Sequence, residues 1–163
     1  MNELQRLIAS DGAFTPPSRL LDAIPNEISA VRPAGVPHSI IEELWHIVYW
    51  LDFFRPAARC EPSSYPVSSR EGWRDFDTPS GQEWDSLRTR FAAAIEETCC
   101  LAAGPIEVLS RRETTLVEPG RPPLNLCELL SSVAVHNAYH FGRIVQMRQM
   151  LGIWPPAGGG DLW

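Results

Sequence analysis

The chain has 163 residues, 44% of them hydrophobic and 21% charged, and its formal net charge is −6. A chain of this length can bury about two thirds of its unfolded surface around one core, so we expect a single domain over residues 1–163. The acidic balance argues against nucleic-acid binding. Because all 14 cationic residues are arginine, chemistry that needs a Schiff-base or phosphate-loop lysine is excluded.

The first half of the sequence predicts two short helices and one long one. The short helices are expected over residues 2–10 and near 18–24, where apolar residues recur at helical spacing. The long helix runs over 39–58 and starts with Ser39 and Glu42, the spacing of a capping box. Its inward side carries an apolar residue every three or four positions: Ile40, Leu44, Ile47, Leu51 and Phe54.

Two further long helices are predicted in the second half. One covers residues 80–103, with Ser80 and Glu83 as its capping pair and Gly104-Pro105 as its stop. The other covers residues 125–151 and ends at Gly152. It starts with the same capping pattern, Asn125 followed by Glu128.

The connections are long and rich in proline, of which the chain has 15. We expect loops at 61–79 and 104–123, with at most a short extended piece at 111–117, and a loosely ordered tail at 154–163. Pro56 should kink the first long helix or end it early. The short first helix and the three long helices together predict an all-α four-helix bundle.

Two histidines in the last helix occupy positions that its pattern reserves for the core. His136 and His140 stand four residues apart on the inward stripe of this helix: Leu126, Leu129, Val133, His136, His140, Ile144, Met147 and Leu151. Burying two imidazoles costs free energy unless each ring nitrogen has a partner. A shared metal ion would remove that cost, since His residues at i and i+4 can reach one ion.

The other two histidines differ in their surroundings. His46 lies among apolar and aromatic residues in the first long helix, where it can be either a third ligand or a core histidine with hydrogen-bonded ring nitrogens. His38 precedes the helix cap, so we assign it to a loop or rim. The motif differs from that of the zinc proteases because Asn137, not glutamate, follows His136, and the built-in general base is therefore missing.

Three imidazoles without a fourth protein ligand would leave a coordination position for water or substrate, which is typical of a catalytic site. Imidazole suits zinc, nickel, iron or copper; we expect zinc or nickel. Four nearby residues are candidates for contacts with the ligands or the substrate, or for plain packing: Glu43, Trp50, Asn137 and Tyr139.

The cysteines and the N-terminus indicate in which cellular compartment the protein is expected. No Cys-x-x-Cys spacing occurs among the four cysteines, which we interpret as reduced: Cys60, Cys99, Cys100 and Cys127. The N-terminus lacks a signal-peptide pattern, and no apolar run reaches the roughly 20 residues that cross a bilayer. We therefore expect a cytoplasmic protein that does not bind membranes.

Three stretches together resemble the DinB-like (DinB/YfiT) superfamily of metal-dependent four-helix-bundle proteins. They are the segment from His38 to His46, the pair Gly72-Trp73 with Trp84 after it, and the segment from His136 to Pro156. The resemblance spans nearly the whole chain. It implies an up-down-down-up bundle, a divalent metal held by His46, His136 and His140, and a homodimer. Some relatives act with low-molecular-weight thiols.

The leading hypothesis is an enzyme whose metal activates a thiol or water towards a small-molecule substrate, as a transferase or a hydrolase. Two alternatives stay open. One is a non-catalytic, metal- or ligand-binding stress-response protein. The other is a structural helical dimer without metal, in which the core histidines are satisfied by hydrogen bonds.

Overall fold

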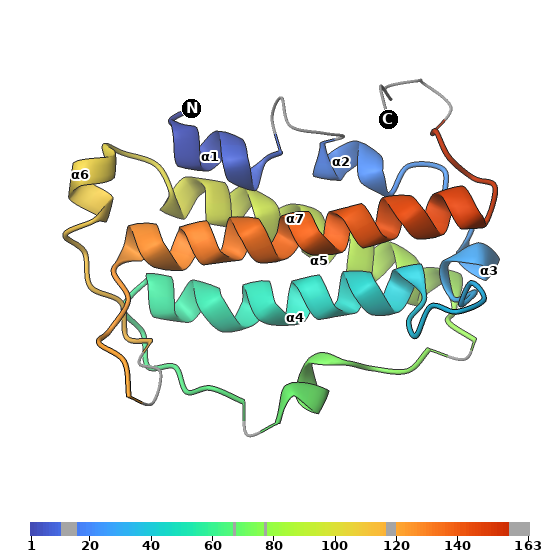
Figure 1. The fold of residues 1–163 in the computed structure, drawn as a ribbon, viewed down its shortest axis with the longest axis horizontal. Coiled ribbons are helices and arrows are strands. Elements are labelled where there is room, and N and C mark those ends of the chain that lie inside the picture. Colours follow the sequence, from blue (N-terminus) through green and yellow to red (C-terminus); the bar gives the residue numbers. More distant parts are fainter. Residues whose placement is uncertain (11–15, 67, 77, 117–119, 157–163) are drawn as a thin grey trace.

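All regular structure in the described part of the chain is helical (Figure 1). The computed structural model describes residues 1–10, 16–66, 68–76, 78–116 and 120–156. Besides the helices, these ranges contain one isolated antiparallel bridge, between Glu113 and Asn125. The helices are α1 (Glu3–Ile8), α2 (Pro17–Leu20), α3 (Asn26–Ser29), α4 (Ile40–Ala58), the 3-10 helix η1 (Ser69–Gly72), α5 (Gly81–Leu101), α6 (Ile106–Leu109) and α7 (Leu126–Met150).

The three long helices, α4, α5 and α7, begin where the capping patterns predict. At α5 the Glu83 amide donates to Ser80 Oγ at 3.1 Å, and at α7 the Glu128 amide donates to the Asn125 side chain at 3.0 Å. At α4 the Ser39 amide donates to the Glu42 carboxylate at 2.7 Å. These bonds satisfy amide groups that have no partner within the helix, which is why the starts could be predicted locally.

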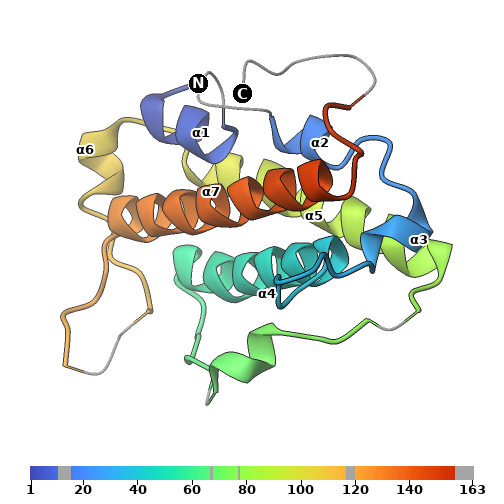
Figure 2. The ribbon, with the colours of Figure 1, turned by 45° about the vertical axis from the view of Figure 1, so that its right-hand side comes forward.

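The long helices pack side by side, and two of them run in the same direction. In Figure 1, α4 and α5 both run from right to left, whereas α7 and the short α1 run from left to right. Helix α4 contacts both α5 and α7, and α1 contacts both α5 and α7 on another side. Two successive helices that run in the same direction need a connection as long as the helix. The described residues between positions 59 and 80 therefore pass back along the outside of α4, with η1 midway (Figure 2).

The apolar core consists of two clusters that follow one another along α7. One packs α1 against the ends of α4 and α5 and the first part of α7, up to Ala134. The other packs α2 and most of α4 against α5, Val133 and the second part of α7, from Phe141 onward. Each fully buried leucine or isoleucine contributes about 1.5–3 kcal/mol to folding. His136 and His140 lie between these two parts of α7, flanked by apolar packing on both sides.

Local differences from the prediction have simple causes. Pro56 neither ends α4 early nor interrupts it, because it lies in the last turn and the helix continues to Ala58. The short helix expected near 18–24 is only Pro17–Leu20, followed by the separate helix α3. The expected loops contain η1 and α6, each a single turn of four residues, which periodicity cannot detect. Most of the expected tail lies outside the described residues.

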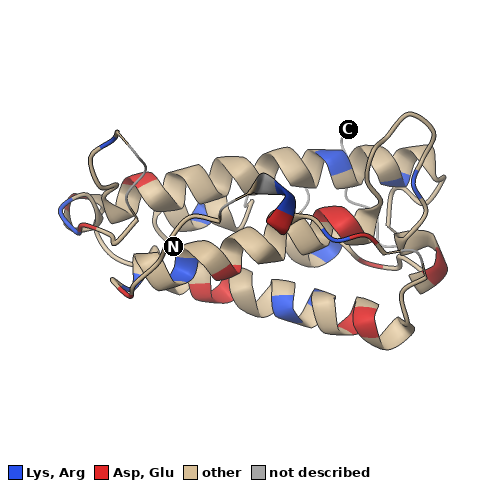
Figure 3. Cartoon of the chain, turned by 90° about the horizontal axis from the view of Figure 1, so that it is seen from below, with Lys and Arg blue, Asp and Glu red and all other residues tan. Residues whose placement is uncertain are grey.

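Arginine and acidic residues are interspersed on the side where the 59–80 connection crosses α4, and this view shows no continuous basic stripe (Figure 3). Within the described ranges, none of the helices combines the length and the apolar character that crossing a bilayer requires. The four cysteines are free thiols: Cys60, Cys99, Cys100 and Cys127.

Arg148 ties the end of α7 to the segments around it. Its side chain is 1% exposed and donates to three backbone carbonyl groups, those of Leu20 at 2.5 Å, Asp22 at 2.9 Å and Ile153 at 3.0 Å. Its guanidinium also lies 5.1 Å from the centre of the Trp154 ring. The arginine thus connects α7 to the segment after α2 and to the residues beyond its own C-terminus.

We predict that Arg148→Met lowers the free energy of unfolding by about 3 kcal/mol, because buried carbonyl groups lose a charged donor while most of the packing volume stays. Urea denaturation followed by circular dichroism measures this change. The matched control is Arg112→Met at an exposed position, which should change stability by less than about 0.5 kcal/mol. Equal effects of the two substitutions would contradict the prediction.

Candidate metal centre

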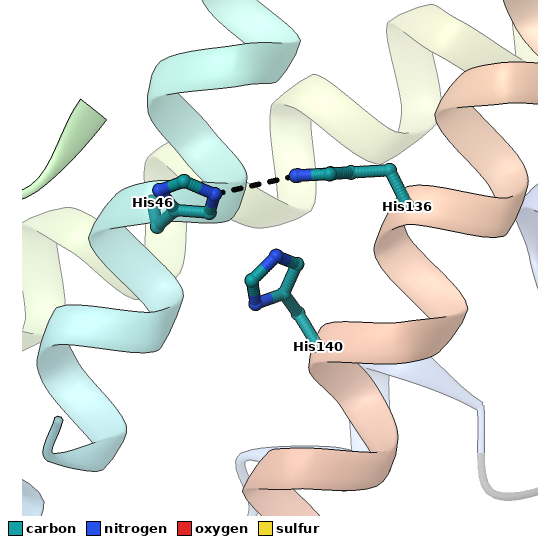
Figure 4. A group of neighbouring side chains, drawn as sticks. All are labelled: His46, His136 and His140. Atoms are coloured by element: carbon teal, nitrogen blue, oxygen red, sulfur yellow. Dashed lines mark hydrogen bonds between the residues drawn. The ribbon is translucent and has the colours of Figure 1, made fainter. Parts of the chain in front are cut away.

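Three histidines from two helices converge on one point (Figure 4). His46 comes from α4, while His136 and His140 come from successive turns of α7. One ring nitrogen of each lies within 4.8 Å of the corresponding atoms of the other two. Nε2 of His46 lies 3.3 Å from Nε2 of His136. His46 and His140 are buried, and His136 is half-buried.

The stagger of α4 and α7 brings these residues to the same height. Figure 1 shows the end of α4 beside the start of α7. His46 lies about three turns before the end of α4, and His136 and His140 lie about three and four turns after the start of α7. Because the helices run in opposite directions, these distances from the shared end match. The sequence gives the number of turns between each histidine and the end of its helix. It does not show how far α4 and α7 are shifted along one another.

The carbonyl group of Gly72 fixes the orientation of His46. His46 Nδ1 lies 3.0 Å from this oxygen, which can only accept a hydrogen bond, so Nδ1 carries the proton and Nε2 presents a lone pair. Glycine also leaves room for this contact. A Cβ atom on Gly72 would lie 3.2 Å from His46 Nδ1 and 3.3 Å from Trp50 Nε1, so a larger residue would force these side chains to shift by a few tenths of an ångström.

His140 is held by a buried carboxylate. Its Nδ1 lies 2.6 Å from Oε2 of Glu43, whose side chain is fully buried, so here too Nδ1 is the donor. The other oxygen of Glu43 accepts from Arg143 Nε at 2.8 Å, and Arg143 donates further to the Tyr139 hydroxyl at 3.0 Å. Arg143 therefore balances the charge of the buried carboxylate, as burial of an ion requires.

Of the three histidines, His136 has the weakest hydrogen bond at Nδ1. Its Nδ1 lies 3.5 Å from the side-chain oxygen of Asn137, at the limit of a hydrogen bond. Asn137 is 1% exposed, and within the described residues its side-chain nitrogen has no hydrogen-bond partner. The outer nitrogens of the three histidines thus face acceptors of three kinds: a backbone carbonyl, a carboxylate and an amide.

The electrostatics of the cluster favour a cation. Burial, followed by the charge of His140, lowers the pKa of both His46 and His136 to about 4, so both rings are neutral at pH 7. With Nδ1 protonated on His46 and His140, the inner nitrogens of these two rings present lone pairs on the side that faces His136. Two nitrogens bound about 2.0–2.1 Å from a tetrahedral ion are about 3.3–3.4 Å apart. The separation of 3.3 Å between His46 and His136 fits this arrangement.

Aromatic side chains enclose one side of the cluster. The Trp73 ring stacks between His46, at 4.0 Å, and His38, at 3.7 Å, measured between ring centres. On the other side, Tyr139 is 60% exposed, and its ring centre lies 4.9 Å from that of His140. The cluster is therefore open to solvent near Tyr139 and the half-buried His136, and it is covered by the connection that carries Trp73.

A family model of the DinB superfamily matches residues 18–144, which include all three histidines. The chain belongs to the DinB superfamily. Comparisons with curated proteins and with solved structures find no match for this chain. The resemblance seen in the sequence is therefore confirmed at the level of the superfamily, whereas the comparisons assign no reaction.

The structure brings together the three histidines that the sequence singled out, and it places His38 outside the cluster, against Trp73. Glu43 was among the residues predicted to contact the ligands or the substrate, or to pack, and the structure shows it bonded to His140. A glutamate in a largely apolar helix is a pattern that indicates a buried, paired carboxylate. Arg143 and the carbonyl group of Gly72 were missed, because only the folded chain brings them to the histidines.

The low pKa values predict how acid affects the metal-free protein. Below pH 6.5 the unfolded chain takes up protons on His46 and His136, whereas the folded protein resists this until about pH 4. The unfolded state therefore binds more protons in this interval, and the free energy of unfolding should fall as the pH falls. The slope is at most about 1.4 kcal/mol per pH unit for each histidine, and less for the half-buried His136.

Urea denaturation of chelator-treated protein between pH 7 and pH 4.5 measures this slope. His136→Asn removes one of the two groups and should make the dependence shallower. Stability that rises on acidification in this interval, or a slope that the substitution leaves unchanged, would contradict the prediction.

Proposed function

We propose that the protein is a metal-dependent enzyme in which His46, His136 and His140 hold a divalent ion, most readily zinc or nickel. The observation that supports this most directly is the orientation of the rings. Nδ1 of His46 and of His140 is bound to an acceptor, so their free nitrogens point inward, towards His136. Without a metal, a neutral His136 could donate its one N–H group to only one of these two lone pairs, for example to His46 Nε2 at 3.3 Å, and the other would stay unpaired.

When bound, the ion would lower the pKa of a coordinated thiol or water and make it a nucleophile. Three protein ligands leave room for such a group, and the solvent-exposed side near Tyr139 is where a small-molecule substrate would approach. The Tyr139 hydroxyl accepts a hydrogen bond from Arg143, so its own hydrogen is free to be donated to a substrate oxygen.

Glu43 orients His140, and neither Glu43 nor Asn137 can act as a general base. Glu43 is engaged by both His140 and Arg143, and Asn137 stands where the zinc proteases carry glutamate. Neither residue is available to take a proton from a nucleophile. Deprotonation would thus depend on the bound ion, which favours an acidic nucleophile such as a low-molecular-weight thiol over water.

We also propose that α1, α4, α5 and α7 form the up-down-down-up four-helix bundle that the family resemblance implies. The contacts of α4 and of α1 with both α5 and α7, and the helix directions in Figure 1, support this. The single domain, the homodimer and the cytoplasmic location stay predictions. Analytical ultracentrifugation of the full chain would test the dimer.

The ligand assignment predicts that His140→Ala abolishes stoichiometric metal binding. The protein purified from zinc- or nickel-supplemented cultures should contain about one ion per chain by elemental analysis, and the variant far less. His38→Ala is the matched control, because His38 lies one aromatic ring away from the cluster and should leave the metal content unchanged. Metal that survives His140→Ala in full would overturn the assignment.

Turnover separates the enzyme from a binding protein. Metal-loaded protein should accelerate the reaction of a low-molecular-weight thiol with small electrophiles, or the hydrolysis of small esters and amides, and His140→Ala should abolish this rate. Full metal content without turnover in either assay would instead favour a non-catalytic metal-binding protein.

The contact between Glu43 and His140 predicts that Glu43→Gln weakens metal binding by about 10–100-fold, because a neutral amide orients His140 less strongly and leaves Arg143 without its counter-charge. Competition with a chromogenic chelator measures the affinity. The control is Glu42→Gln, which changes an adjacent buried carboxylate that bonds to Ser39 and Phe76 and not to a histidine. Equal losses in both variants would indicate general loosening of α4 and contradict the positioning role.

A further inference from the structure

A second cavity lies on the surface between α4, the start of α5 and the connection that carries Trp73. Its volume is about 300 Å³, at the lower end of the range for small-molecule sites. None of the three histidines lines it. Its lining includes Trp45, Arg74, Phe76, Gln82, Ser86 and Arg90.

Two guanidinium groups are fixed against the aromatic wall of this cavity. Arg74 lies 5.2 Å from the ring centre of Trp45 and 4.5 Å from that of Phe76, and Arg90 lies 5.6 Å from the ring centre of Trp45. Contact with an aromatic face holds a guanidinium in place without using its N–H groups. The cavity thus has two cationic groups of defined position.

The acidic partners of these arginines do not saturate them. Arg74 pairs with Glu83 at 3.0 Å, and Arg90 pairs with Asp52 at 2.8 Å. Both pairs are well exposed, so each contributes little to stability, and a guanidinium has five N–H groups to share. Of the two carboxylates, only Glu83 lines the cavity, where it also accepts from the Ser80 amide. The cavity lining therefore carries two positive charges and one negative charge.

The remaining polar groups of the cavity can all donate a hydrogen bond, and those of Gln82 and Ser86 can also accept one. The indole nitrogen of Trp45 is buried and has no hydrogen-bond partner within the described residues. Gln82 and Ser86 of α5 add an amide and a hydroxyl group. A buried N–H group is costly unless an acceptor reaches it, which indicates that the occupant of this cavity presents acceptor atoms.

We propose that this cavity binds a small organic carboxylate. The carboxylate lies between Arg74 and Arg90, and the carbon skeleton packs against Phe76 and Leu87. A carboxylate supplies the acceptors that the guanidinium groups and the Trp45 N–H group require, and it brings the charge of the lining close to neutral. This site is separate from the histidine cluster, so it does not depend on the proposed metal.

Calorimetric titration of the full chain with benzoate tests the proposal, with benzamide as the neutral analogue of the same shape. Benzoate should bind at least ten-fold more tightly than benzamide. Arg74→Gln and Arg90→Gln should each weaken benzoate binding at least ten-fold. Arg88→Gln is the matched control, because Arg88 also lies over a tryptophan ring, that of Trp84 at 5.9 Å, but outside this cavity. It should leave the affinity unchanged.

Three results would overturn the proposal. The first is equal affinity for benzoate and benzamide. The second is benzoate binding that chelator or His140→Ala abolishes while Arg90→Gln does not, since benzoate would then occupy the histidine cluster. The third is binding of inorganic phosphate in the same cavity with no binding of benzoate, which would assign it to inorganic anions.

Circular dichroism checks that each variant is folded. If Arg90→Gln fails this check, Trp45→Phe provides the same test. It keeps an aromatic ring under the arginines and removes the buried N–H group, and it should also weaken benzoate binding.

Discussion

Burial of imidazole is the constraint on which the arrangement of this protein depends. Each ring has two nitrogens, and in an apolar interior both need a partner. The outer nitrogens of His46 and His140 find theirs in the Gly72 carbonyl group and the Glu43 carboxylate. That choice leaves a lone pair on the inner nitrogen of each of these two rings. His136 can donate to only one of them, and the low pKa of His46 disfavours a proton there, so a cation is the group that can satisfy both. The protein core is thus built around a position that suits a metal ion.

The direction of the helices explains why the residues that contact His46 from outside α4 and α7 lie beside it. Because α4 and α5 run the same way, the described residues between positions 59 and 80 must return along the length of α4, and this return path passes the level of His46. Gly72 and Trp73 contact His46 there, and the Phe76 amide donates to Glu42 at 3.3 Å. Burial alone would raise the pKa of Glu42, but hydrogen bonds from Arg32 and Ser39 lower it, so Glu42 holds this connection as an anion.

The parts of this structure that were predictable from sequence are those that depend on neighbouring residues. A capping pair such as Ser80 with Glu83 acts within one turn, so the helix starts could be predicted from the sequence. The apolar period of α7 likewise involves residues one or two turns apart, so the inward position of His140 could be predicted too. The role of Gly72 could not follow, because it rests on a contact between residues 26 positions apart and on a glycine in an ordinary backbone conformation. The same holds for Arg148, whose carbonyl partners become neighbours only after α2 has packed on α7.

The connection along α4 contacts both the histidine cluster and the cavity lined by Trp45, Arg74 and Arg90. Trp73 stacks on His46, whereas Arg74 and Phe76 line the cavity. A ligand held by Arg74 would favour the conformation of the connection seen here, and this conformation is also the one that places the Gly72 carbonyl group against His46. Since any ligand that binds one conformation preferentially stabilises it, occupancy of the cavity and metal affinity should be coupled with the same sign.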